Sequence, residues 1–359
     1  MIRWRKGTVE GVRREWPGAI ELDVAVGGDG ACRALAYPAL VGRPEPGDTV
    51  LLNTTALAMG LGTGGYAIVV AIPDRLPPDP DGPGHLVKAR YTPLQATLLG
   101  ADEQDSPHHE VLRDADSLAG LPVIVADLHS ALPPILAGLL ADRPGTRVVY
   151  VMPDGGALPA WFSMSIGQLK GAGALAATVT TGQAFGGDLE AVTVHTGLLA
   201  ARLVLDAEVV VVAQGPGNLG TGTKWGFSGV SAGEAVNAAA VLSGRPVASL
   251  RVSEGDLRER HVGVSHHSLT AYGRVALARA DVPVPELGGT FGTRVAADAA
   301  ALGDRHALVP VGVEGLEDAL RAAEKEWGVR MSTMGRRLDQ DLPYFLTAAA
   351  AGRHAASLL

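Results

Sequence analysis

Short, unbroken runs of β-branched and small apolar residues constrain the fold of this chain more than any other feature. Strands covered on both faces read as such runs, because neither face of the strand meets water. The pattern therefore predicts a mostly parallel β-sheet buried between two layers of helices. The runs are residues 122–126, 147–152, 177–180, 208–213 and 246–252.

Helical stretches separate these runs. The stretch 231–242 opens with Ser231-x-x-Glu234, which is typical of a capping box, and Gly244 follows its end. Strands that alternate with helices predict right-handed crossovers and a doubly wound, three-layer α/β domain. The remaining expected helices are 132–140, 166–175, 191–205, 318–327 and 343–359.

The first 75 residues have a different character. Short runs bounded by Gly, Pro and Asp predict a small antiparallel β-barrel-like domain, a structural or oligomerising module. Its expected strands are 7–12, 20–26, 33–37, 49–53 and 66–72. Five prolines then fall within residues 73–85, which is typical of a linker. The predicted organisation is a barrel-like domain over 1–75, a Pro/Gly-rich linker over 76–90 and an α/β domain with C-terminal helices over 91–359.

The composition excludes several classes of protein. Aromatic residues are 4% of the 359 residues and the net charge is −8, which argues against a general nucleic-acid binder, since phosphate contacts need clustered Lys and Arg. Cys32 is the single cysteine, so an intramolecular disulfide and a cysteine-rich metal site are excluded. The most apolar stretch, 197–213, is interrupted by charged residues and is not expected to cross a membrane. We therefore expect a cytoplasmic protein.

Polar residues follow several of the expected strands. Asp127 and His129 come after the first strand, and Asp154 and Asp188 lie beyond the second and third. In an open parallel sheet, ligands bind at the carboxyl ends of the strands. Turns also use Asp and Gly, so chain reversal alone is the plain alternative. We predict that Asp127 and Asp188 orient a catalytic histidine or help to hold a metal ion.

A loop rich in glycine and threonine, 214–224, follows the fourth expected strand. Its Gly-x-Gly-x-x-Gly pattern is not a dinucleotide-binding turn, because the next helix begins only near Ser231, and one residue too many precedes Lys224 for a P-loop. The loop is predicted either to cradle an anion or to be a simple connection. The same two readings apply to residues 331–337. The candidate ligand-binding residues are Gly215, Gly217, Asn218, Gly220, Thr221, Gly222, Thr223, Lys224, Ser332, Thr333 and Arg336.

Three histidines lie within seven residues, at His261, His266 and His267. Adjacent side chains diverge in a strand, so at most one of His266 and His267 is expected to face a given ligand. Either is a candidate catalytic acid or base, and a structural cluster is the alternative. His261, His129 and Asp154 are candidate ligands for Zn, Mn or Fe. The sequence specifies neither the metal nor any cofactor.

Three segments, taken as a set, resemble a bacterial family. They are Gly215-Pro-Gly-Asn-Leu-Gly-Thr-Gly-Thr-Lys-Trp-Gly-Phe-Ser-Gly229, Val264-Ser-His-His-Ser-Leu-Thr270, and residues 51–55 with 60–66. The family is domain of unknown function 3866, and the resemblance covers nearly the whole chain. It implies a bacterial, actinomycete-type origin and carries no assigned activity or catalytic residues.

The expected function is that of an enzyme acting on a small anionic metabolite, such as a phosphorylated one. Lys224 and the loop amides would bind the anion, and His266 or His267 would move a proton. The alternative is a non-catalytic ligand sensor or scaffold that self-associates through the barrel. It predicts no pocket that joins residues 127–130, 181–188 and 214–224. Nucleic-acid binding by the barrel is a third reading, and it requires one basic stripe, formed by Arg3, Arg5, Arg13 and Arg14.

Overall fold

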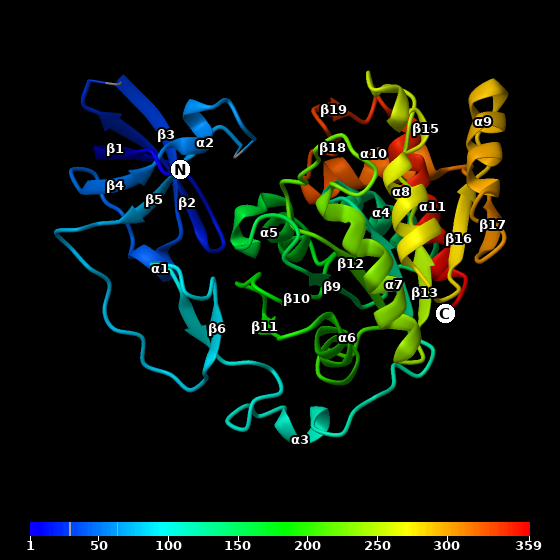
Figure 1. The fold of residues 1–359 in the computed structure, drawn as a ribbon, viewed down its shortest axis with the longest axis horizontal. Helices are drawn as coiled ribbons and strands as arrows, with labels where there is room; N and C mark the ends of the chain where they lie inside the picture. Colours follow the sequence, from blue (N-terminus) through cyan, green and yellow to red (C-terminus); the bar gives the residue numbers. More distant parts are fainter. Residues whose placement is uncertain (29, 63) are drawn as a thin grey trace. The chain divides into compact units, whose positions relative to one another are not determined.

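The computed structural model describes residues 1–28, 30–62 and 64–359 (Figure 1). The chain forms two compact units. The first comprises Met1–Leu98 with Trp161–Gly167, and the second comprises Leu99–Ala160 with Gln168–Leu359. The proline-rich residues 73–85 belong to the first unit and form no helix or strand.

The first unit contains a closed five-stranded barrel in the order β1-β2-β3-β5-β4. The predicted barrel is therefore confirmed, with one difference in strand direction: β3 and β5 run parallel. A closed ring with an odd number of strands cannot alternate direction throughout, so one ladder has to be parallel. The helices and strands of the first unit are β1 (Trp4–Trp16), β2 (Ala19–Val26), β3 (Gly30–Ala36), α1 (Pro38–Val41), β4 (Thr49–Asn53), α2 (Thr55–Ala58), β5 (Ala67–Ala71), β6 (Leu86–Lys88) and β7 (Ala96–Leu98).

Two arginines of β1, Arg13 and Arg14, form ion pairs with carboxylates of β2. Arg13 lies 3.0 Å from Asp23, and Arg14 lies 3.2 Å from the buried Glu21. Two of the four arginines that a nucleic-acid site would need are thus engaged by carboxylates.

The second unit is built on an eight-stranded parallel sheet in the order β11-β10-β9-β12-β8-β13-β16-β17. All five apolar runs contain strands of this sheet, which confirms the predicted α/β class. Its central strands are buried along their whole length, as their unbroken apolar sequences require. The strands are β8 (Pro122–Ala126), β9 (Val148–Met152), β10 (Ala177–Thr180), β11 (Leu189–Glu190), β12 (Val209–Ala213), β13 (Arg245–Ala248), β16 (Asp281–Pro285) and β17 (Ala307–Val311).

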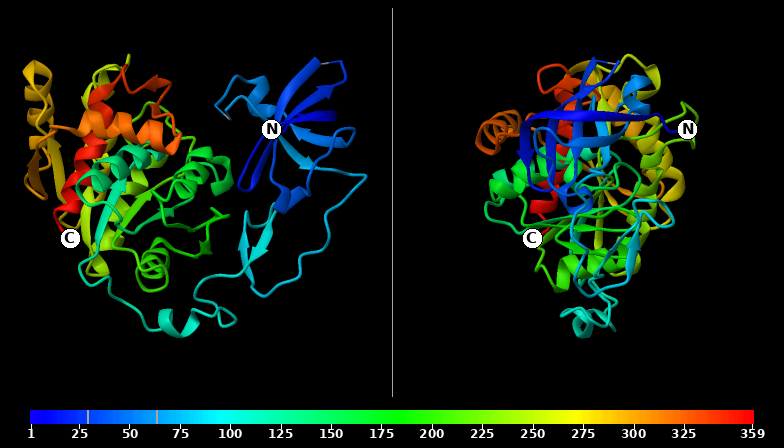
Figure 2. Two further views of the ribbon diagram at one scale, coloured as in Figure 1. Left: turned by 180° about the vertical axis from the view of Figure 1, so that it is seen from behind. Right: turned by 90° about the vertical axis from the view of Figure 1, so that its left-hand side faces the viewer.

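Helices cover both faces of the sheet. One face carries α4 (Leu132–Asp142), α10 (Leu316–Trp327) and α11 (Leu342–Ala356), which pack on one another (Figure 2). The other face carries α6 (Val194–Leu203), α7 (Ser231–Val241), α8 (His266–Thr270) with the π-helix Ala271–Val275, and α9 (Gly289–Ala300) (Figure 1). The remaining elements are α3 (His109–Leu112), α5 (Met164–Gly171), β14 (Val252–Ser253), β15 (Gly263–Val264), β18 (Ser332–Thr333) and β19 (Arg336–Arg337).

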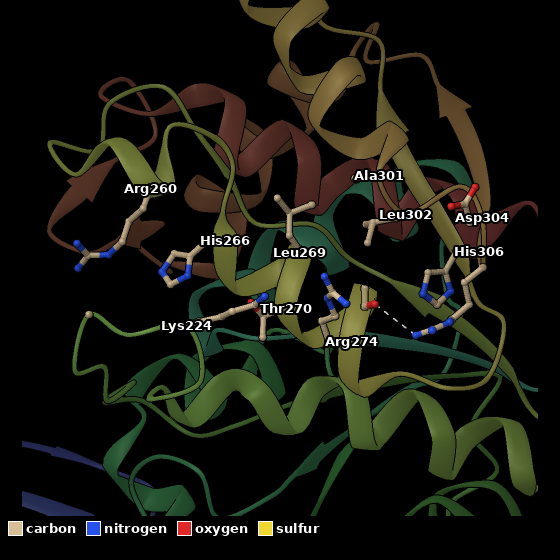
Figure 3. A pocket seen from close by; sticks show the side chains of 13 residues that line it. Lys224, Arg260, His266, Leu269, Thr270, Arg274, Ala301, Leu302, Asp304 and His306 are labelled. Atoms are coloured by element: carbon tan, nitrogen blue, oxygen red, sulfur yellow. Dashed lines mark hydrogen bonds between the residues drawn. The ribbon is translucent and has the colours of Figure 1, made fainter.

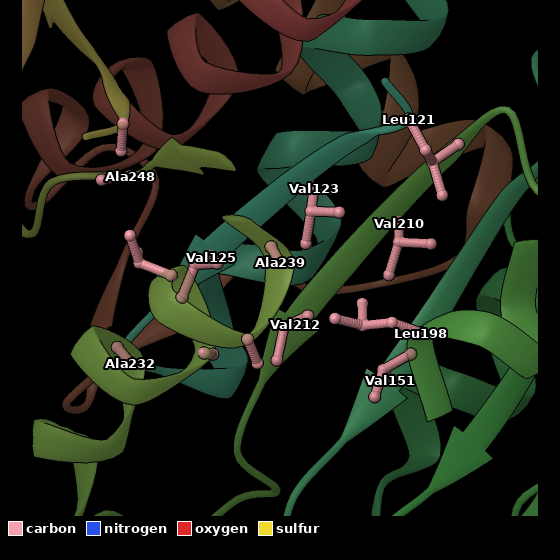
Figure 4. Close-up of a cluster of buried hydrophobic side chains, with 14 of the residues drawn as sticks. Leu121, Val123, Val125, Val151, Leu198, Val210, Val212, Ala232, Ala239 and Ala248 are labelled. Carbon is pink, nitrogen blue, oxygen red and sulfur yellow. The ribbon is translucent and has the colours of Figure 1, made fainter. Parts of the chain in front are cut away.

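The core between the sheet and the α6–α7 layer pairs branched side chains with small ones (Figure 4). Val123 and Val125 of β8 and Val210 and Val212 of β12 are buried, and α7 meets this layer with alanines such as Ala239. Alanine has a small side chain, so the axis of α7 lies close to the valines and the layer between helix and sheet is closely packed.

The predicted capping box at the start of α7 does not form. A 3₁₀ turn, Ser228–Val230, precedes the helix and makes Ser231 its first residue rather than its N-cap. The Ser231 hydroxyl donates instead to the Ser228 carbonyl at 3.2 Å, and Glu234 is exposed. Among the described residues, no helix has the length and apolarity needed to cross a bilayer.

Candidate functional site

The carboxyl edge of the central strands is the place where the topology creates a crevice. The chain leaves β8 through α4 on one face of the sheet and leaves the neighbouring β12 through α7 on the other. Such a reversal is the usual ligand position in open α/β sheets. Here Asp127 and Gln214 fill it, and the Gln214 side chain donates to the Asp127 carbonyl at 2.7 Å. The space left between these strand ends measures about 10 Å³, roughly one water.

Several buried polar atoms around this edge have no hydrogen-bond partner among the described residues. Buried polar groups are almost always satisfied in folded proteins, so a local group of exceptions indicates a position where water, an ion or a ligand belongs. The atoms are Asp127 Oδ2, Gln214 Oε1, Ser249 Oγ, Arg251 Nη2 and His266 Nε2.

An ion network lies beneath these atoms. Arg251 is buried between Asp127, at 3.9 Å, and Asp256, at 3.7 Å. Asp256 also accepts two hydrogen bonds from the Arg258 guanidinium, at 2.9 and 2.8 Å, and these hydrogen bonds hold the pKa of its carboxyl well below the ordinary value. Arg336 joins the network through Asp256, at 3.2 Å, and through Asp341, at 2.9 Å.

Arg336 was a predicted anion ligand, and the structure engages its guanidinium with these two carboxylates. The structure also places the two neighbouring candidates, Ser332 and Thr333. Thr333 is buried and accepts a hydrogen bond from Ser130 at 3.1 Å, whereas Ser332 is exposed.

The three histidines converge above this network. His261 ends a 3₁₀ turn, Glu259–His261, and His266 and His267 form the first turn of α8. The expectation that adjacent histidines diverge was wrong, because these two lie in a helix rather than a strand. The ring centroids are 4.4 Å apart for His266 and His267, and each lies within 4.9 Å of His261. Phe227 stacks on the His267 ring at 3.8 Å and fixes its plane.

The environment of the cluster lowers the pKa of two of its histidines, His261 and His266. Burial, followed by the charges of Arg251 and Arg258, lowers the pKa of His261 to about 3. Burial, followed by the electrostatic effect of the neighbouring His267, lowers the pKa of His266 to about 4. At neutral pH both rings therefore carry a lone pair that a proton or a metal ion can use.

The glycine-rich loop mostly satisfies its own polar groups. Asn218 Oδ1 accepts from Gln214 at 2.8 Å and from Ser228 at 3.2 Å, and the Thr221 and Thr223 hydroxyls bond to each other at 3.0 Å. Gly217 has φ = 95°, a conformation that suits glycine. Chain reversal thus accounts for much of this sequence. Only Gly222 and Lys224 of the loop line the groove described next.

The other predicted residues do not meet the histidine cluster. His129 bonds through Nδ1 to the Tyr150 hydroxyl at 3.0 Å, and burial lowers its pKa to about 4. Asp154 is exposed and accepts the Gln183 amide at 2.8 Å. Asp188 pairs with Lys170 and accepts the Thr178 amide at 2.8 Å. Asp188 therefore lies beside β10. Three inter-strand steps separate β10 from β8, which is a distance of about 14 Å at the usual strand spacing.

A groove of about 780 Å³ runs from the histidine cluster along α8 and the π-helix (Figure 3). Arg260 and His266 lie at one end, and Asp304 and His306 at the other. His306 is structural, since its Nδ1 accepts the Ala280 amide at 3.1 Å and its Nε2 donates to the Tyr272 carbonyl at 2.8 Å. The groove is lined by Gly222, Lys224, Arg260, His266, Leu269, Thr270, Gly273, Arg274, Ala301, Leu302, Asp304, Arg305 and His306.

Sequence reasoning missed Arg251, Asp256, Arg260 and Arg274. Arg251 and Asp256 pair with each other across β14, and Asp256 also pairs with Arg336, which comes 80 residues later, so no local spacing indicates them. Arg260 and Arg274 flank the histidine cluster in the sequence. A count of basic residues near the cluster would have pointed to them.

The comparisons with known proteins add one match. No curated protein and no solved structure is significantly similar to the chain. A family model described as protein of unknown function (DUF3866) matches residues 33–352, which is nearly the whole chain. The chain therefore belongs to the DUF3866 family.

Proposed function

We propose that the second unit is an enzyme that acts on a small anionic metabolite, whose anionic group binds in the basic groove. The observation that carries the proposal is the lining of the groove. Four cationic side chains, Lys224, Arg260, Arg274 and Arg305, line a space of about 780 Å³ together with a single carboxylate, Asp304. This volume is typical of sites for small molecules.

The cations of the groove suit a phosphate or carboxylate. Among the described residues, Arg260 and Arg274 make no ion pair, so their guanidinium groups are available for two-point contacts to an oxyanion. Arg305 is anchored, because it donates to the Ala276 carbonyl at 2.6 Å. The chain as a whole carries a charge of −8, so this positive groove is a local exception that would concentrate an anion.

A catalytic role is favoured by what adjoins the groove. His266 lines one end of it and also carries one of the buried, unpartnered atoms of the sheet edge. Active sites commonly leave polar groups unsatisfied until the substrate is bound. The alternative function is a sensor that binds the same anion. An enzyme would convert the bound metabolite, whereas a sensor would leave it unchanged.

The test measures anion binding and conversion together. Pyrophosphate affinity is measured by calorimetry at fixed ionic strength for the wild type, Arg260→Ala and Arg274→Ala. Each of the two substitutions is expected to weaken binding about fivefold, the effect of losing one solvent-screened charged hydrogen bond. Arg143→Ala, an exposed arginine that follows α4, is the matched control. Unchanged affinity in the Arg260/Arg274 double variant would exclude the groove as the anion site.

Conversion is then followed by mass spectrometry of a mixture of phosphorylated and carboxylated metabolites. The expected result is depletion of a metabolite by the wild type and Arg143→Ala at the same rate, and depletion by Arg260→Ala that is about fivefold slower at substrate concentrations below saturation. Binding of a metabolite without any conversion would select the sensor.

A further inference from the structure

The arrangement of ring nitrogens in the histidine cluster goes beyond what an anion site requires. One nitrogen from each of His261, His266 and His267 lies within 4.8 Å of the other two. His261 is 1% exposed and His267 is 5% exposed. Three imidazoles seldom share a buried space without a partner for their nitrogens, because each unpaired polar atom adds a desolvation cost.

The hydrogen bonds of the cluster leave the Nε2 atoms for a common partner. His261 Nδ1 is 2.7 Å from Ser265 Oγ, so its Nε2 is the remaining ligand atom. His266 Nε2 is buried and has no hydrogen-bond partner among the described residues. His267 Nδ1 faces Arg251 Nη1 at 3.3 Å and Asp127 Oδ2 at 3.8 Å, which again leaves Nε2.

We propose that His261, His266 and His267 hold one divalent transition-metal ion, with zinc as the best match, through their Nε2 atoms. Imidazole nitrogens suit zinc and its neighbours, whereas Mg²⁺ and Ca²⁺ require oxygen ligands. Tetrahedral zinc with bonds of about 2.0–2.1 Å separates its ligand atoms by about 3.3 Å, so the ion draws the rings inward from their present spacing. The proposal goes beyond the proposed function, since it rests on the imidazoles and not on the groove.

The surroundings supply the second shell of such a site. A metal at His267 Nε2 moves the imidazole proton to Nδ1, which then gives up its role as acceptor from Arg251 Nη1, 3.3 Å away, and donates instead toward Asp127 Oδ2 at 3.8 Å. Asp127 Oδ2 has an ion-pair contact with Arg251 at 3.9 Å but no hydrogen-bond partner among the described residues. This is the carboxylate–histidine–metal arrangement that orients ligands in other metalloproteins. Asp127 is thus a positioning residue, and its buried carboxylate would orient His267 in addition to balancing the charge of Arg251.

The local charges admit a cation. Arg251 and Arg258 oppose it, but Asp127 and Asp256 already balance these two guanidiniums. Among the described residues, the ligand group contains no fourth His, Cys, Asp or Glu. Three protein ligands leave a fourth position for water or substrate, which is the pattern of catalytic rather than structural zinc.

The metal itself is the first measurement. The full chain, without an affinity tag, is stripped with a chelator and titrated with Zn²⁺ against a colorimetric competitor. We expect one equivalent to bind with a Kd of about 0.1 µM or tighter. His266→Ala, the least buried ligand, is expected to weaken binding by about 100-fold or more, and Asp127→Asn by about 10- to 100-fold. His195→Ala, an exposed histidine of α6, is the matched control.

Two results would overturn the proposal. One is wild-type affinity weaker than about 10 µM, and the other is equal affinity in His266→Ala and the wild type. Co²⁺-loaded protein provides a second readout, because four-coordinate cobalt absorbs visible light and Asp127→Asn should shift that spectrum. Arg260→Ala is expected to bind Zn²⁺ normally. Failure of the metal site and failure of the anion groove are therefore separate outcomes.

Discussion

The crossing of α4 and α11 behind the sheet depends on two glycines that face each other. A Cβ added to Gly138 would lie 2.6 Å from the Ala349 carbonyl carbon and 2.8 Å from its Cα. A Cβ added to Gly352 would lie 2.8 Å from the Leu139 nitrogen. These neighbours are backbone atoms, so they cannot rotate away, and the two helices must separate by about 1 Å to reach ordinary contact.

We predict that Gly138→Ala lowers the free energy of unfolding by about 2 kcal/mol. Overpacking a rigid contact costs about 3 kcal/mol, and the better helix propensity of alanine returns about 1 kcal/mol. For a unit of this size, the fall in Tm should be about 4–8 °C. Because one separation relieves both clashes, the Gly138/Gly352 double variant should lose less than the sum of the single losses.

Urea unfolding followed by circular dichroism measures these losses. The control is Gly171→Ala in α5, where an added Cβ meets nothing within 4 Å. This variant should be unchanged or more stable by up to about 1 kcal/mol. A Gly138→Ala protein as stable as the wild type would refute the close-packing argument.

Three further predictions concern the polar centre. Arg251→Met should cost about 3–5 kcal/mol in urea unfolding, because Asp127 and Asp256 lose their buried counter-ion; a loss below about 1 kcal/mol would contradict this. Hydrogen bonds from Arg258 depress the pKa of Asp256 in the folded protein, so the unfolded chain binds more protons and the free energy of unfolding should fall as the pH drops below about 4. Asp256→Asn should make this fall less steep. The same dependence of stability on pH in the variant and the wild type would contradict the prediction. Tyr272→Phe should cost about 1–2 kcal/mol by thermal unfolding, because its buried hydroxyl shares its one hydrogen between the carbonyls of Val125, at 2.8 Å, and Ser249, at 3.1 Å; full stability would show that water replaces it.

In the parallel sheet, the strands that the sequence predicted are those that are almost wholly buried. All five apolar runs contain strands of the sheet, whereas β16 and β17 escaped prediction because prolines interrupt them. Pro283 and Pro285 are two residues apart, so the backbone N–H groups that these prolines lack would both have pointed to the same edge of β16. The ladder between β13 and β16 pairs only Val247 with Asp281, whereas that between β16 and β17 runs through five residue pairs. The prolines are thus tolerated in β16 because one of its two edges makes few backbone hydrogen bonds, although prolines within a sequence argue against a strand.

The candidate site could be predicted by residue type but not by arrangement. Asp127 and the three histidines were all singled out from the sequence. Their convergence depends on the β14–β15 hairpin, which folds the chain back so that Ser265 bonds to the Arg251 carbonyl at 2.8 Å. Nothing in the local pattern marks a hairpin whose two strands have only two residues each. A strand in place of the first turn of α8 would have separated His266 from His267.

The same segment explains why the groove lies beside the sheet edge rather than in the crevice between β8 and β12. Polar side chains fill that crevice, so the metabolite that we propose as ligand would need another opening. The π-helix Ala271–Val275 provides it, and Asn237 of α7 holds its end, donating to the Val275 carbonyl at 3.1 Å and accepting the Leu277 amide at 2.7 Å. Single π-turns occur mostly at functional positions, because their looser hydrogen bonds must be compensated. Deleting one residue from this turn would rotate Arg274 by about 100° relative to α8 and would take its guanidinium out of the groove while leaving the three histidines in place.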